Sequence, residues 1–179
     1  MADFFDALEQ KHIDFIMAQQ MFFVATAPKK GRINLSPKGL DCFRILSPTE
    51  VAYLDYTGSG NETAAHLLDD DGRITIMFNS FTRNALIMRL YGRGTAHGPD
   101  TARFKDLMAM FEDALGIRQI FTIKIDNLQT SCGYGVPIYD LIEERKTLTK
   151  WTEKKGEQGI KDYVEAENRI SIDGLPTGK

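Results

Sequence analysis

Short segments rich in aromatic and β-branched residues follow one another closely through most of this 179-residue sequence. Such segments are typical of β-strands, and only one or two helices interrupt their succession. A doubly wound parallel sheet requires regular alternation of strands and helices, so this order favours an antiparallel barrel with helices over its openings. The expected strands are 22–27, 33–36, 43–46, 50–56, a run ending at Phe78, 86–97 and 117–126.

The helical signals lie at the two ends of the chain and between the strands. Residues Leu8 to Gln20 place apolar side chains three to four positions apart, which predicts an N-terminal amphipathic helix. A second helix is expected to end before Gly72 and a third to span 100–115. The polar segment 146–179 predicts a helical and extended tail on the barrel or on a partner subunit, which leaves 1–145 as the barrel domain.

Composition excludes several classes of protein. The chain is 42% hydrophobic with a net charge of −3, which suits a globular domain and predicts no general attraction to nucleic acid or membranes. Cys42 and Cys132 are too few for a disulfide framework, and the three histidines lie far apart, so we expect no metal site. The N-terminus carries acidic residues where a signal peptide has basic ones, so a cytoplasmic location is expected.

The stretch DYTGSGNETAAHL, residues 55–67, leaves a strand through two glycines and enters a helix. Hydroxyl groups and free N–H groups at such a helix start suit a phosphate group. Equally, Ser59 or Asn61 could simply cap the helix, with Glu62 in its first turn. The stretch matches neither the triphosphate-binding nor the dinucleotide-binding glycine motif, which leaves a ligand with one terminal phosphate as the functional alternative.

Two further segments carry side chains suited to an anionic ligand. In RINLSPKG, Ser36 and Lys38 lie on a strand, and Lys38 could meet a phosphate or could be a solvated turn residue. In LIMRLYGRG, Arg89 sits in mid-strand among apolar residues, and its planar guanidinium suits a phosphate or a flavin carbonyl edge. Cys132 is a weak candidate nucleophile, because no neighbouring basic residue lowers its pKa.

The order of FFVATA, GRINLSPKG, VAYLDYTGSGNETAAHL, RITIMF and RLYGRG resembles the pyridoxamine 5'-phosphate oxidase-like flavoproteins, the FMN-binding split-barrel group. The similarity covers about residues 20–175. It implies a mainly β fold, a six-stranded antiparallel split β-barrel with an N-terminal helix and a C-terminal helical extension. It also implies a homodimer that binds FMN in a cleft between the subunits and acts on a small molecule.

The resemblance carries over to particular residues. Ser36, Pro37 and Lys38 would border the flavin, the loop and helix start would hold its phosphate, and Arg89 would line the same cleft. The oxidase's basic RxVLLK strand and Ser-Arg-Lys loop read INLSPKG and SGNET here, and its C-terminal substrate motif has no match, which argues against pyridoxamine phosphate as the substrate. The residues expected at the phosphate end are Thr57, Ser59, Asn61, Glu62 and Thr63.

Two functions follow from these expectations. The first is an FMN-dependent oxidoreductase, in which the flavin supplies the electron chemistry and no residue has to act as a nucleophile. The second is a non-catalytic module that binds flavin, haem or another ligand. The glycine-rich helix entry favours the first function, and the low positive charge favours the second.

Overall fold

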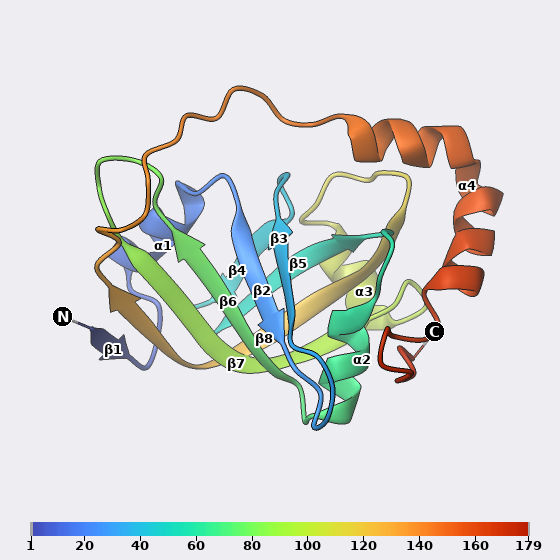
Figure 1. The fold of residues 1–179 in the computed structure, drawn as a ribbon, viewed down its shortest axis with the longest axis horizontal. Helices are drawn as coiled ribbons and strands as arrows, with labels where there is room; N and C mark the ends of the chain where they lie inside the picture. Colours follow the sequence, from blue (N-terminus) through green and yellow to red (C-terminus); the bar gives the residue numbers. More distant parts are fainter. Residues whose placement is uncertain (1, 179) are drawn as a thin grey trace.

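A computed structural model describes residues 2–178, and these form one large antiparallel sheet with helices packed around it (Figure 1). The strands follow the order β3-β2-β6-β7-β8-β5-β4, and β1 pairs separately with β8. Their bounds are β1 Asp3–Phe5, β2 Phe22–Thr26, β3 Asn34–Lys38, β4 Phe43–Ser47, β5 Glu50–Tyr56, β6 Arg73–Asn79, β7 Ile87–His97 and β8 Ile117–Ser131.

The sheet curls into a barrel that stays open. Neighbouring strands pair antiparallel throughout, and the two edge strands, β3 and β4, are not paired with each other in the described part of the chain. This is the mainly β split barrel with flanking helices that the sequence predicts. The sheet has eight strands in residues 2–178 rather than the six that the resemblance implies. The seven segments expected from the sequence all form strands, and Asp3–Phe5 adds a short one against Leu128–Thr130, beyond the predicted end of β8.

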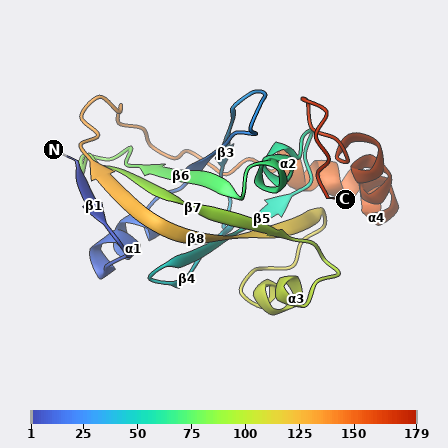
Figure 2. The ribbon, with the colours of Figure 1, turned by 90° about the horizontal axis from the view of Figure 1, so that it is seen from below.

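Four helices accompany the sheet in residues 2–178: α1 Gln10–Met17, α2 Glu62–Asp69, α3 Ala102–Met108 and α4 Thr147–Glu167. Figure 2 shows α2 and α3 on opposite sides of the long strands β7 and β8. The sequence predicts a third helix that reaches residue 115, but α3 ends at Met108, because Met110 and Phe111 donate to the carbonyls of Leu107 and Met108 and tighten the turn.

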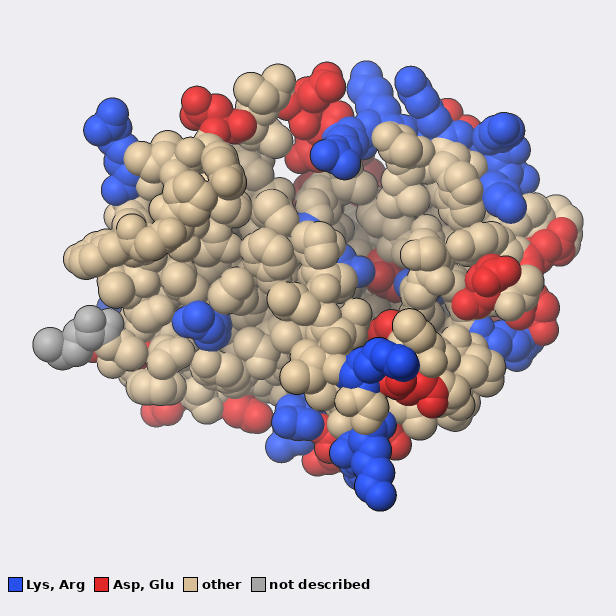
Figure 3. Space-filling view, viewed as in Figure 1, with Lys and Arg blue, Asp and Glu red and all other residues tan. Residues whose placement is uncertain are grey.

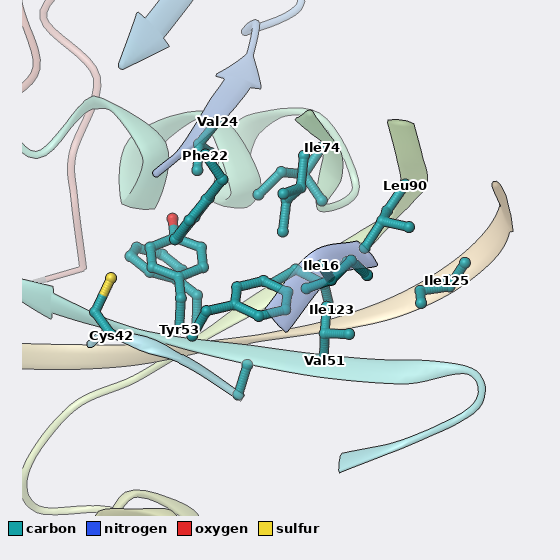
Figure 4. Close-up of a cluster of buried hydrophobic side chains, with 14 of the residues drawn as sticks. Ile16, Phe22, Val24, Cys42, Val51, Tyr53, Ile74, Leu90, Ile123 and Ile125 are labelled. Carbon is teal, nitrogen blue, oxygen red and sulfur yellow. The ribbon is translucent and has the colours of Figure 1, made fainter. Parts of the chain in front are cut away.

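The core inside the barrel is aromatic at one end and aliphatic at the other (Figure 4). Phe22 packs against Phe43 and Tyr53 with ring centroids 5.1 and 5.8 Å apart, and Tyr53 stacks on Phe121 at 4.9 Å. These rings come from β2, β4, β5 and β8, so the packing joins the edge strand β4 to β2, the neighbour of the other edge strand β3. The core therefore fixes the position of β3 relative to the end of β5.

The C-terminal part crosses the molecule. Residues 132–146 run as an extended linker from the end of β8 to α4, which lies at the far side in Figure 1. Gly156 has a φ of 65° and kinks α4, and the segment after Glu167 folds back toward α2. The division of the chain at residue 145 stays a prediction. No helix in residues 2–178 combines the length and apolar character needed to cross a membrane.

Candidate functional site

A cavity of about 360 Å³ lies where β3 passes the end of β5 and the start of α2. The face shown in Figure 3 is hollowed, and both basic and acidic atoms are visible in its depth. Because residues alternate along a strand, Asn34, Ser36 and Lys38 of β3 all face this cavity. The remaining lining residues are Asp55, Tyr56, Gly58, Ser59, Gly60, Asn61, Glu62, Thr63 and Arg118.

A buried ion pair forms the floor of the cavity. Asp55 Oδ2 accepts hydrogen bonds from Nε and Nη2 of Arg118 at 3.0 and 2.8 Å and from Nε2 of Gln119 at 2.9 Å. Its other oxygen, Oδ1, lies 3.3 Å from Nζ of Lys38. Burial raises the pKa of Asp55, but the positive charges of Arg118 and Lys38 and the hydrogen bonds outweigh burial and hold the pKa below its ordinary value.

The loop between β5 and α2 is held by side chains that lie far away in the sequence. Arg118 Nη1 donates to the carbonyl of Gly60 at 2.9 Å, and Asn168 Nδ2 donates to that of Gly58 at 3.1 Å. Asn61 accepts from Gln119 at 2.8 Å and donates to the carbonyl of Asn168 at 3.4 Å. The loop is therefore fixed by β8 and by the C-terminal segment.

The start of α2 is left without a side-chain cap. Asn61 occupies the N-cap position, but its side chain makes no capping bond and instead joins Gln119 and Asn168. The N–H groups of the first turn therefore remain available to an anion or to water. Glu62 does lie in that turn, as the capping alternative expects, but the side chain of Asn61 makes no capping hydrogen bond.

Glu62 is turned toward the C-terminal segment. Its Oε1 accepts a hydrogen bond from the backbone N–H of Ile172 at 3.0 Å. Its Oε2 is buried without a hydrogen-bond partner among residues 2–178 and lies 3.8 Å from Nε2 of His66, which is fully buried. The carboxylate thus sits between the cavity and a second hollow of about 510 Å³ that His66 and Ile172 help to line.

The residues present fit a phosphate group, with one restriction. Lys38, the hydroxyls of Ser36, Ser59 and Thr63 and the uncapped turn of α2 all face one space. A Cβ on Gly58 would meet no atom within 4 Å, so the loop backbone is open to a ligand. The formal charges of Lys38, Arg118, Asp55 and Glu62 cancel, however, so this protomer supplies dipoles and hydroxyls rather than net positive charge.

Six of the nine predicted site residues share the cavity, and three do not. Thr57 lines a larger hollow of about 670 Å³ between α3 and α4, and its hydroxyl has no partner within the described chain. Pro37 alternates with the cavity-facing residues and is exposed. Arg89 lies half-buried on the outer face of β7, where Nη1 donates to Ser131 Oγ at 3.3 Å. The six in the cavity are Ser36, Lys38, Ser59, Asn61, Glu62 and Thr63.

Sequence reasoning missed the residues that hold the site together. Asp55 stands inside an apolar strand, directly before the glycine-rich loop, and a lone carboxylate in that position is the one available signal. Arg118 and Gln119 begin a strand that otherwise reads as ordinary alternation, and Asn168 gives no sequence signal. Only the pairing of β5 with β8 brings Asp55 opposite Gln119.

The described residues also include the potential metal ligands and the two cysteines. In residues 2–178 no group of three or more His, Cys, Asp or Glu side chains could hold a metal ion. Both cysteines are free thiols, with Cys42 buried and Cys132 exposed. Burial raises the pKa of Cys42 to about 12, which disfavours the nucleophilic thiolate form at neutral pH.

Comparison with known proteins agrees with the fold. A solved structure of a proposed pyridoxamine 5'-phosphate oxidase from Lactobacillus delbrueckii superposes with a TM-score of 0.56 at 17% identity, covering 69% of this chain and 94% of that one. A single-residue variant of HupZ from Group A Streptococcus superposes with a TM-score of 0.54 at 21% identity, covering 69% and 98%. At these identities the similarity supports the fold.

Sequence comparison is more specific. A profile of the family described as pyridoxamine 5'-phosphate oxidase matches residues 8–132. The pyridoxamine 5'-phosphate oxidase family protein ustO of Aspergillus flavus is 37% identical over 197 aligned residues, covering 98% of this chain and 78% of the relative. From the profile match, the relative and the split barrel together, this chain belongs to the pyridoxamine 5'-phosphate oxidase family.

Proposed function

We propose that this protein is an FMN-binding flavoprotein, an oxidoreductase that uses the bound flavin to oxidise or reduce a small molecule. The observation that carries the proposal is the uncapped first turn of α2, which opens into a cavity that also receives Lys38 and Ser36. A helix start with free N–H groups, hydroxyls and one lysine is suited to a single terminal phosphate. Membership of the family supports a flavin as the bearer of that phosphate.

Each part of the cofactor would be bound by a different set of residues. Ser59, Thr63 and the N–H groups of the first turn of α2 bind the phosphate, with Lys38 as the nearest cation. Ser36 and the backbone around Pro37 border the next part of the cofactor. FMN, when bound, supplies the transfer of electrons, and the chain supplies binding, orientation and exclusion of water. The buried Asp55 keeps Lys38 and Arg118 at the floor of the site.

A second copy of the chain would complete the site. The cavity of one protomer, about 360 Å³, lies near the lower limit for small-molecule pockets, so it suits the phosphate end better than the whole cofactor. Ile33 and Leu35, which alternate with the cavity-facing residues of β3, have 76% and 62% of their surface exposed. We propose a homodimer that buries these side chains, and Arg89 of the second copy is the candidate for the flavin edge.

The alternative is a module that binds flavin, haem or another ligand without turnover. The observation that favours this module is that the formal charges lining the cavity sum to zero. Such a cavity attracts a dianionic phosphate less than a basic loop would. The free thiols Cys42 and Cys132 are compatible with the reducing cytoplasm in either case.

Purification and a redox titration test the proposal. The protein is expected to be yellow, or to become so on reconstitution with FMN, and its flavin absorbance is expected to bleach with NADH or NADPH. Binding without bleaching by any donor supports the non-catalytic module, and protein that stays colourless after reconstitution overturns FMN binding. Light scattering tests the dimer separately, because a monomeric mass contradicts the shared cleft.

A further inference from the structure

We infer that Asn168, in the C-terminal segment, is the positioning residue that sets the shape of the phosphate-binding loop, Gly58 to Asn61. The inference rests on the proposed function, since it assigns the loop to the phosphate of FMN. It places the decisive contact 36 residues beyond the end of the family profile match, 168 minus 132. The C-terminal segment would thus be part of the cofactor site rather than an accessory tail.

Asn168 contacts both ends of the loop and the arginine beneath it. Its Nδ2 donates to the carbonyl of Gly58 at 3.1 Å, and its backbone carbonyl accepts from Nδ2 of Asn61 at 3.4 Å. Its Oδ1 accepts from Nη1 of Arg118 at 2.7 Å, and the same Nη1 donates to Gly60 at 2.9 Å. Asn168 therefore joins Gly58 and Asn61 directly and reaches Gly60 through Arg118.

The chemistry of the position requires an amide. Asn168 is fully buried, and it uses a donor toward a carbonyl and an acceptor toward a guanidinium at the same time. Aspartate would keep the acceptor and lose the donor, and alanine would lose both. Either change leaves the carbonyl of Gly58 without its partner.

The C-terminal segment is itself fixed around Asn168. Thr177 Oγ1 donates to the carbonyl of Asn168 at 2.6 Å, and the N–H of Thr177 donates to the carbonyl of Arg169 at 3.0 Å. The N–H of Asn168 donates to the carbonyl of Val164 at 3.0 Å, at the C-terminal end of α4. The backbone of Asn168 is thus held by two hydrogen bonds and its neighbour Arg169 by a third, which supports a positioning role for this residue.

The loop has a physical need for such a support. Gly58 and Gly60 have few steric limits, so ordering them costs more conformational entropy than ordering other residues. A loop that is already ordered before the ligand arrives binds that ligand more tightly, because its conformational entropy is lost on folding and not on binding. Since the loop is assigned to the phosphate, disorder of the loop should weaken the binding of FMN more than the binding of riboflavin, which has the same ring system and no phosphate.

The test measures FMN and riboflavin affinity by quenching of flavin fluorescence in the full-length protein. Asn168→Ala and Asn168→Asp are expected to lower the affinity for FMN at least about tenfold, while the affinity for riboflavin changes by less than about twofold. Asp173→Ala is the matched control, because Asp173 holds the same segment to Arg32 without touching the loop, and it is expected to keep the ratio of the two affinities.

The outcomes separate the inference from the proposed function. If the unmodified protein binds neither flavin, the proposed function fails. If it binds FMN and Asn168→Ala keeps the ratio of FMN to riboflavin affinity, the inference fails alone. Equal losses for the two flavins, or the same loss in Asp173→Ala, also overturn it, because a general loss of structure would explain them.

A milder variant covers the case in which Asn168→Ala does not fold. Thr177→Val preserves the shape of the side chain and removes only the hydroxyl that donates to the carbonyl of Asn168. A smaller but selective loss of FMN affinity is expected, with riboflavin unaffected. Unchanged FMN affinity in a folded Thr177→Val protein, judged by circular dichroism, contradicts the inference.

Discussion

Asp55 and Arg118 form an ion pair that joins the end of β5 to the start of β8, with Oδ2 and Nη2 only 2.8 Å apart and the side chains 3% and 5% exposed. Removing one partner leaves an uncompensated buried charge. Arg118→Ala is therefore expected to lower the free energy of unfolding by about 3–5 kcal/mol, as measured by urea denaturation. Arg73→Ala breaks the exposed pair with Asp70 and is expected to cost under about 1 kcal/mol. Equal losses of unfolding free energy in the two variants would contradict the larger contribution of the buried pair.

The same ion pair predicts how stability depends on pH. The pKa of Asp55 is lower in the folded protein than its unfolded value of about 3.9, so between the two values the unfolded chain binds more protons. Its contribution is complete above about pH 4 and is lost as the pH falls through the folded pKa. Asp55→Asn is expected to be less stable at pH 7 and to lose less stability on acidification. Urea midpoints measured from about pH 6 to about pH 3 test this, and parallel curves for the two proteins would refute it.

The two thiols are expected to differ in reactivity. Cys42 is buried and its pKa is raised to about 12, while Cys132 is exposed on the linker side of β8. A chromogenic thiol reagent should therefore modify one cysteine per chain in the native protein and two in denaturant. Cys132→Ser is the control, because it should abolish the fast reaction. Native modification that persists in Cys132→Ser would mean that Cys42 is accessible.

Gly92 marks the bulge at which the pairing of β7 with β8 shifts register. A Cβ at this position would overlap the carbonyl oxygen of Lys124, which belongs to the paired strand. Gly92→Ala is expected to destabilise the protein by at least about 1–3 kcal/mol and to lower its melting temperature. Gly135→Ala, where a Cβ meets nothing within 4 Å, should change the melting temperature little. A scan by differential calorimetry decides between these outcomes.

Lys38 is the one cation of β3 that faces the cavity, and a charge-assisted contact with phosphate contributes about 1.5–3 kcal/mol. Lys38→Met is accordingly expected to weaken FMN binding about ten- to hundredfold, with a smaller effect on riboflavin. Lys30→Met, an exposed lysine on the hairpin before β3, is the control and should bind FMN normally. An FMN affinity that is unchanged in Lys38→Met would remove this residue from the proposed site.

The alternation of residues explains why part of the site could be predicted. Ser36 and Lys38 are two positions apart on one strand, so any register that exposes one to the cavity exposes both, and Pro37 must face away. Ser59 to Thr63 lie within one short loop and helix start, so local geometry keeps them together. Arg89 could not be placed in this way, because its strand is three positions away from β3 in the sheet and its face is the outer one.

Local pattern thus determined strands β2 to β8, the helix entry after Gly60 and the positions of Ser36 and Lys38 on one face of β3, because periodicity and turn chemistry act over a few residues. Only the tertiary structure decided what supports them. Asp55, Arg118 and Asn168 come from β5, β8 and the segment after α4, and they meet because β5 pairs with β8 and the C-terminal segment folds back on the loop. Contacts between residues so far apart in the chain leave no periodic trace in a sequence, since they depend on how elements pack and not on what forms them.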